Sequence, residues 1–164
     1  DVWGSAFAVY TQALPGDAAQ RVSEALRDAL AAGTIARQGQ IRHLPTDADF
    51  SETTMWESVV GDRPKNRYQN GAYWATPVGW VCYAVAQIGE DAAKQLALDY
   101  VADLRDDDFR QGDDHGAPWE CAYPWTGAYP GTGAHPDGEH RQNPVYMASV
   151  TCPLGAFRRL GWAL

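Results

Sequence analysis

A glutamate between aromatic residues is the strongest candidate for chemistry in this sequence. Glu120 lies in the stretch PWECAYP, directly after Trp119 and three positions before Tyr123. Such neighbours partly desolvate a carboxyl group, and this is the environment in which a carboxyl serves as an acid or a base near neutral pH. The alternatives are Glu139, which lies between histidines in AHPDGEH, and a surface glutamate with no catalytic role.

Two further stretches place a Gln-Asn pair before aromatic residues at the start of an apolar run: YQNGAYWATPVGW at 68–80 and RQNPVYMASVTCPLG at 141–155. Flat aromatic rings pack against the C–H faces of sugars, and amides exchange hydrogen bonds with hydroxyl groups. The alternatives are that the aromatic residues belong to the core and that each asparagine caps a helix. The side chains predicted to bind a sugar are Trp3, Gln69, Asn70, Tyr73, Trp74, Trp119, Trp125, Gln142 and Asn143.

Other polar residues give weaker indications. His115, His135 and His140 match no zinc-binding spacing, so we predict no metal and no cofactor. Arg42 and His43 are interpreted as a solvated loop pair, with the alternative that they reach the pocket from the first loop. The three cysteines are far apart, which favours free thiols and leaves one disulfide as an alternative.

Helical periodicity and apolar runs predict five helices joined by two long loops at 34–67 and 106–142, the first with a short strand at 40–44. The first helix of each pair is apolar nearly all round and is expected to be buried, whereas the second has one polar face and is expected to lie outside. The helices are predicted at 2–14, 17–32, 72–88, 90–107 and 144–160.

The helix pairs repeat along the chain. Asn70 and Tyr73 align with Asn143 and Tyr146 at an offset of 73 residues. The unit is an apolar helix, an amphipathic helix and a long loop, with two units complete and a third begun. Units of this kind that alternate inner and outer helices around an axis form a helical toroid. The predicted fold class is therefore all-α, with helical hairpins and long irregular loops on one face.

Four segments, DVWGSAFAVY, YQNGAYWATPVGW, PWECAYP and QNPVYMASVTCPLGA, resemble the C-terminal half of the six-hairpin (α/α)6 glycosidases, which include glucoamylases, trehalases and rhamnosidases. The resemblance covers the whole chain and implies a single domain at 1–164, about two and a half hairpins of a larger barrel. Its partners would be the missing N-terminal half of that barrel or a second copy of the chain.

The resemblance implies an inverting glycoside hydrolase acting on a carbohydrate in a central pocket. Glu120 lies in the loop before the last inner helix, where that superfamily commonly has its general base, and the catalytic acid would lie in an earlier hairpin. The alternatives are a phosphorylase, a polysaccharide lyase that uses Tyr and His, or a carbohydrate-binding domain without catalysis.

Composition excludes several other classes. With 164 residues, 45% hydrophobic and 21% charged, the chain is globular and of a size typical of one domain. A net charge of −8 argues against a nucleic-acid partner. No apolar run is long enough to span a membrane and nothing resembles a signal peptide, so a cytoplasmic location is slightly favoured.

Overall fold

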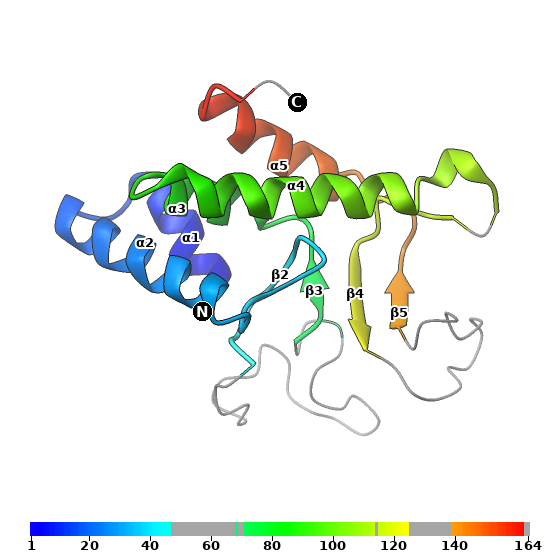
Figure 1. Cartoon of the computed structure of the whole chain (residues 1–164), viewed down its shortest axis with the longest axis horizontal. Coiled ribbons are helices and arrows are strands. Elements are labelled where there is room, and N and C mark those ends of the chain that lie inside the picture. Colours follow the sequence, from blue (N-terminus) through cyan, green and yellow to red (C-terminus); the bar gives the residue numbers. More distant parts are fainter. Residues whose placement is uncertain (47–67, 69–70, 114, 125–138, 163–164) are drawn as a thin grey trace.

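The computed structural model describes residues 1–46, 68, 71–113, 115–124 and 139–162. In the view of Figure 1 the helices occupy one side of the molecule and strands β2 to β5 extend from them toward the other. The helices are α1 (Val2–Tyr10), α2 (Gly16–Ala31), α3 (Val78–Ala86), α4 (Glu90–Asp106) and α5 (Ala148–Arg159), with a short 3-10 helix η2 (Phe109–Gln111). The strands are β1 (Ala36–Arg37), β2 (Gln40–Arg42), β3 (Tyr73–Trp74), β4 (Cys121–Pro124) and β5 (Glu139–Gln142).

All five predicted helices are present, and α3 is the central one. It packs against α1, α2, α4 and α5, and most of its residues are buried. Helix α4 buries a single face, with Ala93, Leu96, Ala97 and Tyr100 inside. This confirms the prediction of an apolar inner helix followed by an amphipathic outer one for the α3–α4 pair. It is wrong for α1, which buries only Val2, Ala6 and Val9. Helix α3 begins later than predicted because strand β3 occupies its predicted start. Helix α5 begins later because bends with positive φ at Asn143 and Val145 precede it.

The prediction of an all-α fold is wrong. The strands form one antiparallel sheet in the order β1-β2-β3-β4-β5, so the fold is mixed α/β and is not the predicted helical toroid. β3 occupies the predicted start of a helix, and β4 and β5 lie in a segment predicted to be irregular. Each strand has only two to four residues, which is too short for a period of two to show in the sequence. The strand predicted at 40–44 is confirmed by β2.

The sheet joins segments that are distant in the sequence. Trp74 of β3 pairs with Ile41 on one side and with Cys121 on the other. β1 and β2 form a hairpin whose turn contains Gln38 and Gly39, both with positive φ, at 49° and 73°, as a two-residue hairpin turn requires. A Cβ atom on Gly39 would lie 2.1 Å from the backbone nitrogen of Tyr100. The hairpin turn therefore rests directly on the backbone of α4.

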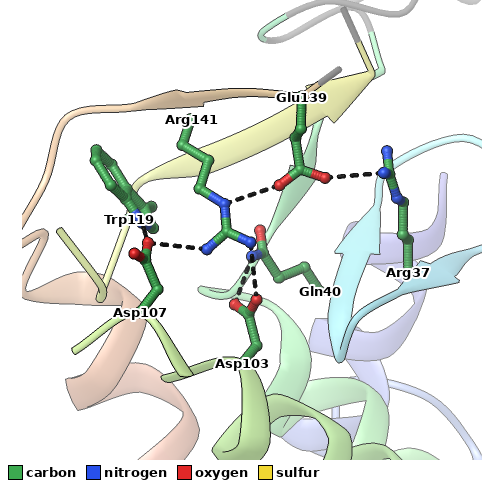
Figure 2. A network of polar contacts seen from close by, with 7 residues as sticks. All are labelled: Arg37, Gln40, Asp103, Asp107, Trp119, Glu139 and Arg141. Carbon is green, nitrogen blue, oxygen red and sulfur yellow. Dashed lines mark hydrogen bonds and ion pairs between the residues drawn. The ribbon is translucent and has the colours of Figure 1, made fainter. Parts of the chain in front are cut away.

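A buried ionic network fastens the sheet to the C-terminal half of α4. The Arg141 guanidinium of β5 lies 3.3 Å from a carboxylate oxygen of Asp103, 3.0 Å from one of Asp107 and 2.8 Å from one of Glu139. Figure 2 shows Arg141 between Glu139 and two aspartates, Asp103 of α4 and Asp107 directly after it. Burial lowers the pKa of Arg141, but the three carboxylates raise it and the net shift is upward. This cation therefore stays charged in the interior.

Three more side chains extend this network. Arg37 of β1 lies 3.0 Å from Glu139, Gln40 of β2 donates to Asp103 over 2.9 Å, and the Trp119 indole donates to Asp107. Burial raises the pKa of Asp103, and the attraction of Arg141 and the hydrogen bond from Gln40 oppose this shift. The network therefore connects both edges of the sheet to one helix.

The remaining sequence predictions on cysteines and membranes can be compared directly with the structure. All three cysteines are free thiols, which confirms the favoured alternative. Across the part of the chain that is described, no helix combines the length and apolar character needed to cross a membrane.

We expect Arg141→Met to lower the free energy of unfolding by about 3 to 5 kcal/mol, because it leaves three buried carboxylates without their shared cation. Arg105→Met is the matched control, since Arg105 is an exposed arginine of α4, the helix that carries Asp103. This control should change stability by no more than about 0.5 kcal/mol. Urea unfolding of both variants measures the effect. Equal losses from the two variants would contradict a structural role for the network.

A second prediction concerns the crossing of α3 and α5. A Cβ atom on Gly79 would lie 2.7 Å from Cα of Pro153 and from Cβ of Ala156, whereas one on Gly155 would meet nothing within 4 Å. We expect Gly79→Ala to lower the free energy of unfolding by about 1 to 3 kcal/mol through overpacking. Gly155→Ala should raise it by about 0.5 to 1 kcal/mol through helix propensity. Urea unfolding measures both variants, and changes of the same sign in their free energies of unfolding would disprove the close helix crossing.

Candidate active site

Glu120 lies directly before β4, and its side chain is surrounded by hydrogen-bond donors. The residue is 6% exposed. The Tyr68 hydroxyl donates to its Oε1 over 3.4 Å, the Asn143 amide donates to its Oε2, and the Tyr146 hydroxyl makes a third polar contact. The Glu120 backbone N–H donates to the carbonyls of Gln142 and Asn143 at 3.0 and 3.1 Å. Backbone and side chain are thus both fixed by the segment that follows β5.

That segment has a strained backbone. Asn143 and Val145 have φ of 50° and 56°; asparagine tolerates this left-handed region, but a β-branched residue there is an outlier. Two hydrogen bonds hold the conformation, from the Val145 N–H to the Gly116 carbonyl at 2.9 Å and from the Tyr146 N–H to the Pro118 carbonyl at 2.7 Å. The strain allows two nearby side chains, Asn143 and Tyr146, to reach the same carboxylate.

The two tyrosines remain protonated donors. Burial first, and then the negative charge of Glu120, raise the pKa of Tyr68 and of Tyr146. No positively charged side chain is recorded as an ion-pair partner of Glu120 in the part of the chain that is described. The carboxylate therefore receives hydrogen bonds from neutral groups only.

An aromatic cluster lies next to this carboxylate. The Trp74 ring packs against Tyr68 with centroids 5.3 Å apart and against Trp3 at 5.4 Å. Tyr68 thus contacts both the cluster and Glu120. Trp74 is 8% exposed, and its indole N–H has no hydrogen-bond partner among the described residues. A buried donor without a partner is uncommon in folded proteins.

Arg42 and His43 are buried beside the same cluster, at 6% and 4% exposure. The interpretation of the two as a solvated pair is therefore wrong. The His43 ring lies edge-on to Trp3, with centroids 5.6 Å apart. Burial, followed by the positive charge of Arg42, lowers the pKa of His43 to about 4. This imidazole is neutral at pH 7.

The structure brings together only part of the predicted sugar-binding set. Trp3 and Trp74 lie at the cluster, and Asn143 holds Glu120 instead of capping α5, whose N-cap is Met147. Tyr73 of β3 interacts with Arg42, and Gln142 contributes its backbone carbonyl.

The other predicted residues lie elsewhere. Trp119 points to the ionic network, where its indole bonds to Asp107 and its carbonyl accepts from the Ser149 hydroxyl at 2.6 Å. Gln69, Asn70 and Trp125 lie outside the described residues.

Sequence reasoning missed Tyr68 and Tyr146 as members of the site, and it gave His43 only as the alternative to a solvated pair. The two tyrosines had a visible signal: Tyr68 opens the YQN stretch, and Tyr146 is the repeat equivalent of Tyr73. The burial of His43 had no such signal, because it depends on packing against Trp3 from a different segment. Over the residues that the structure describes, no three His, Cys, Asp or Glu side chains are arranged to hold a metal ion.

No family model, no curated protein and no solved structure matches this chain. An assignment of function therefore depends on the chemistry of the site itself.

We expect Val145→Gly to raise the free energy of unfolding by about 1 kcal/mol, because glycine adopts positive φ without the strain that valine bears. Val145→Ala is the control: it removes nearly the same exposed side chain but keeps a Cβ atom in the left-handed region, so its gain should be smaller. Thermal unfolding of both variants provides the comparison. A glycine variant less stable than the alanine variant would show that the segment is unstrained.

Proposed function

We propose that this chain supplies the general base of an inverting glycoside hydrolase, with Glu120 in that role. The observation that carries the proposal is a buried carboxylate held by neutral donors beside an aromatic cluster that contains an unpaired indole N–H. Inverting glycoside hydrolysis requires such a carboxylate to take a proton from water. The resemblance to six-hairpin glycosidases points to the same residue.

In the proposed reaction, Glu120 removes a proton from a water molecule while the oxygen of that water attacks the anomeric carbon. The bond from that carbon to the leaving oxygen breaks, and a second carboxyl group protonates the leaving oxygen. That acid is not assigned to a described residue, because the resemblance places it in an earlier hairpin. Tyr68, Asn143 and Tyr146 orient Glu120 without neutralising its charge.

The aromatic cluster would bind the sugar. The indole N–H of Trp74 is suited to donate to a sugar hydroxyl, which would satisfy a donor that has no partner among the described residues. The rings of Trp3 and Tyr68 offer apolar surface for the C–H face of a pyranose. Sugar contacts and base would then lie on adjacent strands, since Trp74 pairs with the residue that follows Glu120.

Glu120→Gln tests the base in the intact natural gene product. Oligosaccharides of different linkages are screened for release of reducing sugar, and anomer-resolved NMR of the product establishes inversion. On a hydrolysed substrate, we expect Glu120→Gln to lower kcat by about 100- to 10,000-fold with little change in KM. Trp74→Phe should mainly raise KM. Glu90→Gln, on the exposed face of α4, is the control and should leave both constants unchanged.

Two outcomes would overturn the proposal. Full activity of Glu120→Gln on a hydrolysed substrate would remove Glu120 as the base. Sugar binding that Trp74→Phe abolishes, without turnover of any oligosaccharide, would favour a carbohydrate-binding domain.

One observation favours a polysaccharide lyase as the second candidate. Tyr123 of β4 and His140 of β5 are paired across the sheet, with ring centroids 4.9 Å apart, and a Tyr/His pair can replace the carboxylate base in polysaccharide lyases. Acidic polysaccharides distinguish the two reactions: a lyase releases an unsaturated product that absorbs in the ultraviolet, and Tyr123→Phe should abolish it. A hydrolase releases a saturated reducing sugar from its substrate.

A further inference from the structure

A cleft of about 650 Å³ lies on the helical side of the molecule. Its walls come from the end of α1, the first half of α2 and the end of α3, and it shares no residue with the surroundings of Glu120. In Figure 1, α2 lies at the far left, whereas β4 and β5 lie at the right. The volume is in the range of small-molecule sites.

A buried hydroxyl in the wall of this cleft has no partner. Ser23 of α2 lines the cleft and is 1% exposed, and its Oγ makes no hydrogen bond. A serine inside a helix commonly bonds to the carbonyl one turn earlier or to solvent. Because nearly all buried polar atoms are hydrogen-bonded in folded proteins, this hydroxyl needs a partner that the described residues do not provide.

A second residue of the cleft wall, Gln12, has a strained backbone conformation. Gln12 follows the end of α1 with φ of 59°, a left-handed conformation for which glycine is preferred at helix ends. The residue lines the cleft. An amide side chain is therefore kept at a position where glycine would be less strained, which indicates that the side chain itself has a use.

The chemistry of the walls points to a neutral ligand. Amides predominate among the polar groups, from Gln12, Gln20 and Gln87. The two charged side chains have partners, since Arg27 bonds to Asp28 and Glu24 accepts from Gln20. Gln20 and Gln87 each donate one bond within the protein, to Glu24 and to the Tyr83 carbonyl, so the second N–H and the oxygen of each amide are the groups offered to a ligand. Amides and hydroxyls both donate and accept, so they match ligands that do the same. Apolar groups, including Leu14 and Ile88, provide surface for C–H groups.

We infer that this cleft binds a neutral polyhydroxylated molecule of the size of a mono- or disaccharide, with the Ser23 hydroxyl as a central contact. This second site is independent of the proposed reaction at Glu120. It makes the chain a carbohydrate binder on its helical side.

Two-dimensional amide NMR with glucose and with maltose tests the site. We expect saturable shifts of α2 amides around Ser23 and of the end of α3. Ser23→Ala should weaken binding about fivefold or more through the lost hydrogen bond. The same variant should melt at an unchanged or higher temperature, because it removes an unpaired buried hydroxyl, so weaker binding would not reflect unfolding.

Further variants separate the two sites. Gln87→Leu should weaken the α2 shifts, while Glu120→Gln should leave them unchanged. Absence of α2 shifts with both sugars would overturn the inference, as would α2 shifts that Ser23→Ala leaves unaltered. Shifts confined to the sheet would also overturn it, while supporting sugar binding near Glu120.

Discussion

The rest of the site depends on the ion pairs between the buried Arg141 guanidinium and its three carboxylates. A buried guanidinium is costly unless carboxylates surround it, and Asp103, Asp107 and Glu139 do so here. These partners lie on α4 and β5, so the pairing fixes the position of β5 relative to the helices. Because β5 leads directly into Asn143, the same pairing determines where a donor to Glu120 lies. A stable anchor and a candidate reactive group thus share one strand.

This arrangement strains the backbone of the residues that follow β5. β5 has to end at Gln142, and α5 has to begin at Ala148. Within that short span two side chains must reach back to Glu120, which the chain achieves through positive φ at Asn143 and Val145. Strained conformations persist where the surrounding structure determines them, and here hydrogen bonds from Val145 and Tyr146 to the segment before β4 do so. Strain at this point indicates selection for geometry over stability.

The sequence predicted the helices well because each carries many turns of a clear pattern. The sheet was not predicted, because a two-residue strand such as Tyr73–Trp74 is too short to show a period of two. It forms only through pairing with Ile41 and Cys121, which are distant in the sequence. The same limit applies to the site. The aromatic neighbours of Glu120 predicted a desolvated carboxyl, whereas its hydrogen bonds to Tyr68 and Tyr146 depend on long-range pairing. Trp119, adjacent in sequence, points to the ionic network instead.

Two buried glutamates near the β4–β5 pair show why one suits catalysis better than the other. Glu139 is 3% exposed and contacts two guanidiniums, from Arg37 and Arg141. Its charge is largely compensated, and removing it would deprive the buried Arg141 and the partly exposed Arg37 of a counterion. Glu120 is nearly as buried, but its partners are hydroxyl groups and an amide, which orient an anion without cancelling it. A general base must accept a proton and later release it, and only a carboxylate with neutral partners can do so without breaking an ion pair.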